Sequence, residues 1–156
     1  MNIRIGIGYD IHRLEKGKKL LLGGVEIPSP KGVIAHSDGD VLLHAVCDGL
    51  LGACGLGDIG RYFPDTDAKW KGISSIELLK KTYDITNKKS ECRILNIDTV
   101  VICDEPKLAK HTDKMKKKIS ESLKMDPDKI NIKAKTTEGT AEDRIVAYAT
   151  VLVEVE

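Results

Sequence analysis

Two histidines and an aspartate are the side chains in this sequence best suited to chemistry. Residues 2–9 alternate isoleucine with arginine and glycine, which predicts a strand whose even positions share one face. Asp10 and His12 extend that face. His44 follows on a helical pattern that starts near Asp38. We therefore expect one carboxylate and two imidazoles to converge on a single cation.

Two nitrogens and one oxygen suit zinc, and three protein ligands leave the fourth tetrahedral position open for a substrate oxygen. An Asp-x-His pair alone is more often ordinary loop chemistry. Here His36, Asp38 and Asp40 lie in one short segment, and such a density of histidine and carboxylate favours a metal site. His36 remains an alternative ligand.

The predicted helix offers two partners for the second ring nitrogen of His44. Asp40 and Asp48 lie four residues to either side of it, on the same helical face, so either could accept a hydrogen bond from the imidazole. Asp40 could instead cap the amino terminus of the helix.

Hydrophobic patterns divide the rest of the chain into strands and helices. A hairpin is predicted around Gly23-Gly24, and later helices begin near Ser74 or Ser75 and near Pro106. Strands are predicted at 93–103 and 130–134. The last strand places six apolar side chains on one face: Ile145, Ala147, Ala149, Val151, Val153 and Val155.

This order predicts a single α+β domain over residues 1–156, with a mixed β-sheet and helices packed on one face. The other face of the sheet then needs a partner, so we expect an oligomer. The four cysteines show no C-x-x-C spacing, which argues against a disulfide framework.

The charge balance and hydropathy exclude several classes of partner. The 25 basic residues nearly equal the 24 acidic ones, so no overall electrostatic case exists for nucleic acid. The lysines at 114–118 are expected on a solvated helix face. The sequence shows neither a leader nor an apolar run long enough for a membrane. We expect a cytoplasmic protein, or a plastid stromal one if a transit segment has been removed.

Three further segments have the composition of ligand-binding loops. Residues 133–139 combine lysine, hydroxyls and a carboxylate, which suit phosphate oxygens and a hard divalent cation. Residues 103–107 end a strand where free backbone amides and Lys107 could accept an anion or a nucleobase edge. Gly57-Asp58-Ile59-Gly60 suggests close approach of the backbone to a ligand, although a simple turn is the alternative.

Five blocks in fixed order carry a specific resemblance. They are GIGYDIHRL at 6–14, HSDGDVLLHAVCDGLLGA at 36–53, GLGDIGRYFPDTD at 55–67, Glu105-Pro106-Lys107, and KAKTTE at 133–138. With them, nearly the whole chain resembles the 2-C-methyl-D-erythritol 2,4-cyclodiphosphate synthase family of the non-mevalonate isoprenoid route.

The resemblance implies a cyclising, CMP-releasing phosphorus–oxygen lyase. Its substrate would be 4-diphosphocytidyl-2-C-methyl-D-erythritol 2-phosphate and its products the 2,4-cyclodiphosphate and CMP. It also implies a homotrimer with the sheets facing the three-fold axis and three active sites between adjacent subunits.

The resemblance further assigns roles to individual residues. It places zinc on Asp10, His12 and His44, and magnesium or manganese on Glu138. His36 and Ser37 would contact phosphate, Asp58 and Gly60 the erythritol hydroxyls, and Lys107 the diphosphate, while Asp65 and Asp67 belong to an adjoining mobile loop. Cytidine would be framed by Cys103 to Ala109, including Pro106, and by Ala134 and Lys135. Thr136 and Thr137 would hold phosphate, and His36, Thr136 and Glu138 would join the zinc ligands as catalytic residues.

The sequence departs from the family after Glu138. The family carries a longer glycine-rich segment, GLGFTGRGEG, that lines the central cavity of the trimer. Here the corresponding segment, residues 139–144, is shorter and contains no phenylalanine. Its arginine, Arg144, is displaced along the chain from the position of the family's arginine. Two other functions fit the same residues: a metal-dependent phosphohydrolase, which would release a linear phosphate ester, and a nucleotide-binding or zinc-storage module without turnover.

Overall fold

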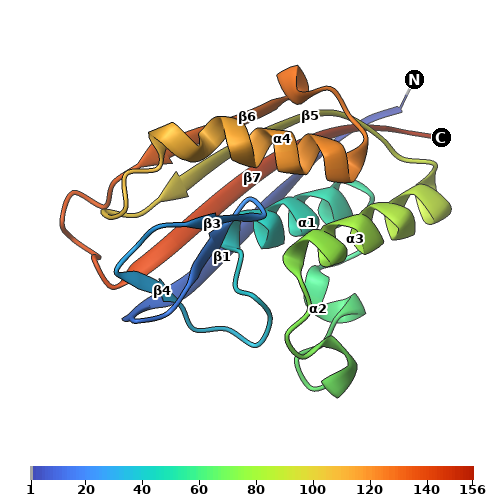
Figure 1. Ribbon diagram of the computed structural model, residues 1–156. Coiled ribbons are helices and arrows are strands. Elements are labelled where there is room, and N and C mark those ends of the chain that lie inside the picture. Colours follow the sequence, from blue (N-terminus) through green and yellow to red (C-terminus); the bar gives the residue numbers. More distant parts are fainter. Residues whose placement is uncertain (1) are drawn as a thin grey trace.

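The computed structural model describes residues 2–156, which form a five-stranded sheet, a separate hairpin and a layer of helices (Figure 1). The strands are β1 (Asn2–Lys16), β2 (Leu20–Leu22), β3 (Val25–Ile27), β4 (Lys31–Val33), β5 (Arg93–Ile102), β6 (Ile130–Lys135) and β7 (Arg144–Val155). The α-helices are α1 (Val41–Ala53), α2 (Ile59–Tyr62), α3 (Ser75–Ser90) and α4 (Thr112–Leu123). Short 3-10 turns span Ala68–Trp70, Ala109–His111 and Pro127–Lys129.

The main sheet has the order β4-β1-β7-β5-β6. β1 runs antiparallel to β7 from the pair Asn2↔Val155 to the pair Arg13↔Arg144. β5 is antiparallel to β7 and parallel to β6. The predicted mixed sheet is therefore confirmed, and the parallel pair places the ends of β5 and β6 at one edge.

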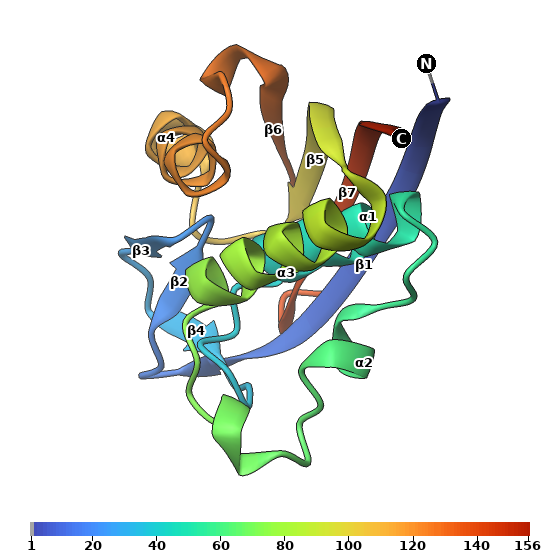
Figure 2. The ribbon, with the colours of Figure 1, turned by 90° about the vertical axis from the view of Figure 1, so that its right-hand side faces the viewer.

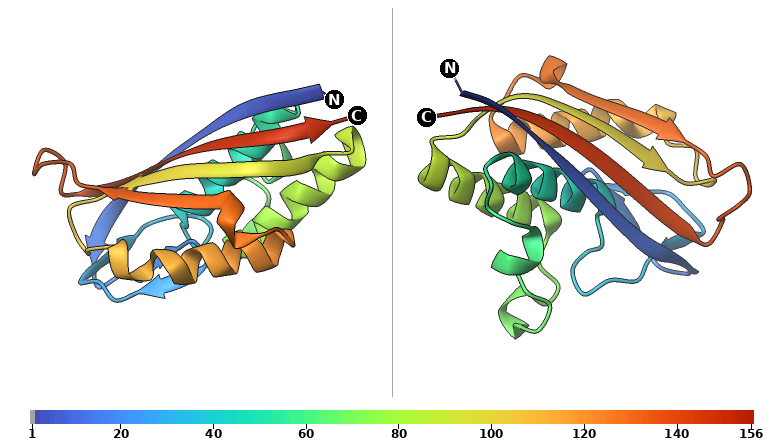
Figure 3. Two further views of the ribbon diagram at one scale, coloured as in Figure 1. Left: turned by 90° about the horizontal axis from the view of Figure 1, so that it is seen from above. Right: turned by 180° about the vertical axis from the view of Figure 1, so that it is seen from behind.

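The helices cover one face of this sheet, as predicted (Figures 2 and 3). Six alternate residues of β7, from Ile145 to Val155, are all buried beneath them. The alternation in the sequence identified this core face correctly because strand side chains point to opposite faces in turn.

Two glycines of β1 allow α1 to pack directly on the strand backbone. A methyl group at Gly6 would lie 1.9 Å from the carbonyl oxygen of Gly49, and one at Gly8 would lie 1.7 Å from that of Ala45. Neither position has space for a side chain larger than hydrogen. This close approach brings the first turn of α1, with His44, beside the later part of β1.

The opposite face of β1 is apolar and exposed. Its side chains from Ile3 to Ile11 are between 41% and 73% exposed, with Ile7 the most exposed. Tyr9 lies against Tyr148 of β7, with ring centroids 5.0 Å apart. The uncovered sheet face expected from the sequence is thus present in residues 2–156.

Several boundaries differ from the sequence prediction. Residues 103–108 are not helical, and α4 begins at Thr112 after a 3-10 turn. Leu108 is buried at 4% exposure, so this loop packs into the core instead of extending the helix. β4 and α2 were not predicted because elements of three and four residues carry no periodic signal. In the described part of the chain, no helix combines the length and hydropathy of a membrane span.

Candidate active site

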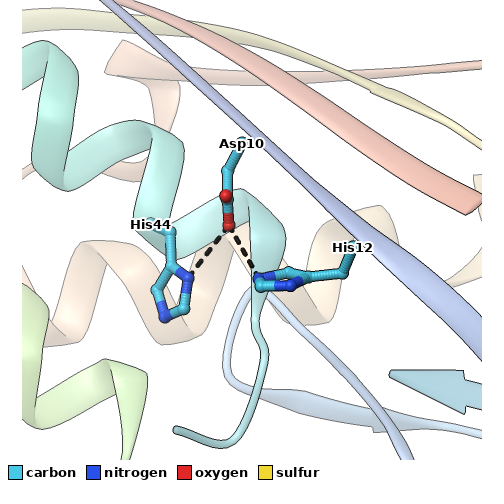
Figure 4. Close-up of side chains that lie close together, drawn as sticks. All are labelled: Asp10, His12 and His44. Atoms are coloured by element: carbon cyan, nitrogen blue, oxygen red, sulfur yellow. Dashed lines mark hydrogen bonds and ion pairs between the residues drawn. The ribbon is translucent and has the colours of Figure 1, made fainter. Parts of the chain in front are cut away.

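Asp10, His12 and His44 converge as the sequence predicted (Figure 4). The Oδ2 atom of Asp10 lies 2.9 Å from Nε2 of His12 and 3.0 Å from Nδ1 of His44. One potential ligand atom of each residue lies within 4.8 Å of the other two. Residues 2–156 contain no other such group of three, so His36 is not part of the cluster.

The contact between Asp10 and His12 is not a hydrogen bond in its geometry. Nε2 of His12 is buried and has no hydrogen-bond partner, although the carboxylate oxygen is close. A buried polar atom without a partner is unusual and calls for an explanation. An imidazole nitrogen that lies beside a carboxylate without bonding to it fits a place for a shared metal ion.

The charges within the cluster reinforce each other. Burial opposes the ionisation of Asp10, but the close contacts and charges of the His12 and His44 imidazoles outweigh it and lower the pKa of the carboxyl to about 2. Burial also opposes a positive charge on His44, yet the hydrogen bond to Asp10 raises the pKa of this imidazole. The carboxylate is thus ionised and available to a cation at neutral pH.

A serine from α3 faces the second ring nitrogen of His44. Nε2 of His44 lies 2.9 Å from Oγ of Ser75 and 3.2 Å from Oγ of Ser37. Ser75 donates both its hydroxyl and its backbone N–H to Asp38, the latter at 2.8 Å. The hydroxyl of Ser75 can therefore accept from Nε2–H, so that Nδ1, which faces Asp10, could give up its proton and bind a metal.

The partner of His44 differs from the two carboxylates that its own helix offers. Asp40 proves to be the helix cap, since it accepts hydrogen bonds from Leu43 N at 3.1 Å and from the hairpin amides of Gly23 and Gly24 at 3.0 and 2.7 Å. Asp48 accepts from Ile59 N at 2.7 Å. Burial raises the pKa of both carboxyls against these bonds. Neither carboxylate bonds to the His44 ring, whose nitrogens face Asp10, Ser37 and Ser75, so the partner role considered for them is wrong.

A cavity of about 370 Å³ opens beside the cluster. Four other residues singled out in the sequence line it, namely His36, Ser37, Gly60 and Asp65, together with apolar side chains that include Phe63, Trp70 and Ile73. Asp58 and Asp67 are not among its lining residues. Asp58 caps α2 by accepting from Arg61 N at 3.1 Å, and Asp67 caps the following 3-10 turn by accepting from Lys69 N at 2.9 Å.

A second, smaller cavity of about 160 Å³ lies at the ends of β5 and β6. Of the residues predicted to frame cytidine, Cys103, Pro106, Lys107, Leu108, Ala109, Ala134 and Lys135 line it, with Thr136 beside them, whereas Asp104 and Glu105 do not. The two cavities share no lining residue.

The two threonines after β6 have different surroundings. Thr136 is exposed, and its hydroxyl donates to Oε1 of the exposed Glu138 at 3.0 Å. Thr137 instead donates its hydroxyl and its backbone N–H to Asp104. The resemblance places phosphate on both threonines, but only Thr136 has a hydroxyl that lies free of the carboxylate of Asp104.

Known proteins share both the sequence and the fold. The model of the YgbB family matches residues 3–154. A 2-C-methyl-D-erythritol 2,4-cyclodiphosphate synthase of Clostridium botulinum (strain Alaska E43 / Type E3) is 57% identical over 137 residues, which cover 88% of this chain and 87% of the relative. The enzyme of the same name from Syntrophomonas wolfei is 47% identical and covers 97% of this chain and 99% of the relative. A solved structure of a 2C-methyl-D-erythritol-2,4-cyclodiphosphate synthase in its CDP-bound form is 42% identical, with a TM-score of 0.92, over 97% of this chain and 100% of that one.

Proposed function

Because the chain belongs to the YgbB family, we propose that it performs the reaction of the 2-C-methyl-D-erythritol 2,4-cyclodiphosphate synthases it resembles. It would convert 4-diphosphocytidyl-2-C-methyl-D-erythritol 2-phosphate to the cyclic diphosphate and CMP in isoprenoid biosynthesis. The observation that carries the proposal is the Asp10, His12 and His44 cluster beside a cavity, in a chain that aligns along its length with enzymes of this name.

The donor set fits zinc. Two imidazole nitrogens and one carboxylate oxygen would hold the ion, and the cavity adjoins these three side chains. Zinc bound there would supply Lewis-acid polarisation of a phosphoryl oxygen. The contacts of His44 with Ser75 and of Ser75 with Asp38 would keep the proton on Nε2 when Nδ1 binds the metal.

The protein residues would act by binding and orienting an anionic substrate. The attacking group is a phosphate, which already carries negative charge near neutral pH, so no general base is needed. The barrier lies in bringing this anion to a phosphorus atom surrounded by negative oxygens. His36 and Ser37 lie in the cavity beside the cluster, where they would contact phosphate oxygens. Lys107 would neutralise charge on the diphosphate.

The second cavity would hold the cytidine. Cys103 and the residues from Pro106 to Ala109 line it, together with Ala134 and Lys135. Glu138 would bind magnesium or manganese. A single protein carboxylate is enough because magnesium completes its shell with water and substrate phosphates. Thr136, which lines the cavity and contacts Glu138, would bind phosphate oxygens between them.

A complete active site would require two subunits. One substrate must reach both the metal cluster and the cytidine cavity, yet the two cavities share no residue within one chain. The exposed apolar face of β1, from Ile3 to Ile11, offers the surface for association. We propose a homotrimer whose sheets face the three-fold axis and in which the metal cluster of one subunit meets the cytidine cavity of its neighbour.

Product analysis tests the reaction. The purified protein is incubated with the diphosphocytidyl substrate, zinc and magnesium, and the products are followed by phosphorus NMR. The proposal predicts the cyclic diphosphate and CMP in equal amounts. A linear phosphate ester would identify a phosphohydrolase instead, and binding without turnover would identify a nucleotide-binding or storage module.

A further inference from the structure

The carboxylate of Asp104 fixes the segment that carries Thr136 and Glu138. Asp104 follows β5 and Thr137 follows β6, and the hydrogen bond from Cys103 N to Lys135 O at 3.0 Å extends the parallel ladder up to this point. Oδ1 of Asp104 accepts from Thr137 N at 2.8 Å, and Oδ2 accepts from the Thr137 hydroxyl. Both oxygens of one carboxylate are thus engaged by one residue, an arrangement we call the Asp104–Thr137 clamp.

The clamp closes a turn over residues 137–141. The Thr137 hydroxyl accepts from Ala141 N at 3.1 Å, and the Thr137 carbonyl oxygen accepts from Thr140 N at 3.1 Å and from the Thr140 hydroxyl at 2.6 Å. A hydroxyl has a single hydrogen, and that of Thr137 is given to Asp104. It therefore has no proton to donate to a phosphate.

The residues on either side of Thr137 are hydrogen-bonded to each other rather than to Asp104. Thr136 and Glu138 are exposed and contact each other, and Thr136 lines the second cavity. Glu138 adopts the left-handed conformation with φ of 56°, which is unfavourable for a residue with a side chain. Such a conformation persists where the surrounding contacts enforce it. Here those contacts are made by the residue immediately before it.

We propose that Asp104 is a positioning residue: through Thr137 it holds the turn so that the Thr136 hydroxyl and the Glu138 carboxylate face the substrate diphosphate and its divalent cation. The identity of that ligand rests on the proposed function. Asp104 acts through Thr137 because it is not among the residues that line the second cavity. Hydrogen bonding from Thr137 lowers the pKa of Asp104, which keeps the carboxylate ionised and able to accept both bonds at neutral pH.

The test compares Asp104→Ala with a matched control. Asp98→Ala also removes a carboxylate that joins β5 to β6, but Asp98 contacts Lys133 at 2.6 Å and Asn131 at 2.9 Å in the middle of the strands. Three quantities are measured: Mn²⁺ affinity by electron paramagnetic resonance with CDP present, hydrogen exchange of the amides at 137–141, and kcat and KM.

For Asp104→Ala we expect Mn²⁺ affinity and kcat to fall by about tenfold or more, as for other residues that support a metal ligand. KM should change much less, the amides of Thr137 and Ala141 should exchange faster, and zinc content should stay the same. Asp98→Ala should match the unaltered protein in all of these. An Asp104→Ala protein with unchanged Mn²⁺ affinity and amide protection would overturn the proposal.

Variants of Thr137 make the test specific to the clamp. Thr137→Val removes the hydroxyl, and combining it with Asp104→Ala should weaken Mn²⁺ binding by clearly less than the sum of the two single effects. Thr137→Ser keeps the hydroxyl and should recover most of the Mn²⁺ affinity lost in Thr137→Val. Fully additive effects of the two deletions, or no recovery with serine, would contradict a shared clamp.

Two possible failures, an unfolded Asp104→Ala variant and an inactive unaltered protein, can each be distinguished from failure of the clamp. If Asp104→Ala does not fold, Asp104→Asn keeps the shape and one acceptor oxygen, and it should produce a smaller shift in the same direction; no shift would overturn the clamp. If the unaltered protein forms no cyclic diphosphate, the proposed function fails, while Mn²⁺ affinity and amide exchange still decide whether Asp104 positions the turn.

Discussion

Ser75 Oγ lies 2.9 Å from Nε2 of His44, on the side of the imidazole ring opposite Asp10. A residue of α3 thereby orients a candidate metal ligand of α1. The Ser75 hydroxyl is itself held by Asp38, so the ring has a defined partner on each side. Outer contacts of this kind fix the tautomer of a ligating histidine and raise its basicity.

Ser75→Ala should weaken zinc binding by about 10–100-fold while the protein stays folded, because Nε2 of His44 loses its nearer acceptor. Zinc affinity is measured by competition with a chelator. Ser74→Ala is the matched control, since Ser74 is exposed and makes no side-chain capping hydrogen bond. Equal zinc affinity in Ser75→Ala and Ser74→Ala would mean that Ser75 does not support the ligand.

Gly8→Ala should separate α1 from β1. The added methyl would lie 1.7 Å from the carbonyl oxygen of Ala45, so the helix must move. We expect a loss of about 1–3 kcal/mol in the free energy of unfolding and weaker zinc binding, because His44 moves with the helix. Gly52→Ala is the control, because its nearest atom would be 3.8 Å away. If Gly8→Ala has the same stability and zinc affinity as Gly52→Ala, the close packing of α1 on β1 does not position His44.

The patterns that the sequence revealed are those with local periodicity. Alternation identified β1 and β7 with their core faces, and helical spacing placed His44 one turn into α1. The metal cluster could be predicted because two of its members lie on one strand, and the third lies on a helix that glycines bring against that strand.

Contacts between distant elements left no such signal. Asp38 to Ser75 and Asp104 to Thr137 join residues 37 and 33 positions apart, and nothing in the local pattern distinguishes Asp38 or Asp104 from an ordinary loop aspartate. The partner of His44 was therefore sought on its own helix, at Asp40 and Asp48. Only the packing of α3 on α1 shows that it is Ser75.

Mixing two inactive variants should restore activity if each active site is shared. His44→Ala damages the metal half and Thr136→Ala the nucleotide half, so each alone should lose most turnover. In a trimer assembled at random from equal amounts, about one quarter of the sites combine two intact halves. Co-expressed subunits should thus regain roughly that fraction of activity. If the mixture is no more active than the separate variants, both halves belong to one chain.

Zinc affinity should fall with decreasing pH because protons compete with zinc for the histidine ligands. Zinc must displace any proton on its ligands. The pKa of Asp10 is about 2, so this carboxylate is already ionised above about pH 4. Burial lowers the pKa of His44, but Asp10 outweighs it and raises the pKa above the ordinary 6.5. Proton competition should therefore begin at a higher pH than for a free imidazole.

The measurement is the zinc dissociation constant between about pH 5.5 and pH 8. Asp10→Asn removes the charge that raises the pKa of His44. It should weaken zinc binding at every pH, and the further loss of zinc affinity on acidification should begin at a lower pH. An affinity that is flat across this range in the unaltered protein would show that no ligand histidine is protonated there.

Anomalous scattering from crystals grown with zinc, measured above and below the zinc absorption edge, tests the central claim most directly. The account predicts one strong peak within bonding distance of Asp10 Oδ2, His12 Nε2 and His44 Nδ1, with one coordination position directed into the cavity lined by His36 and Ser37. A zinc-replete crystal with no peak between these three atoms would contradict it.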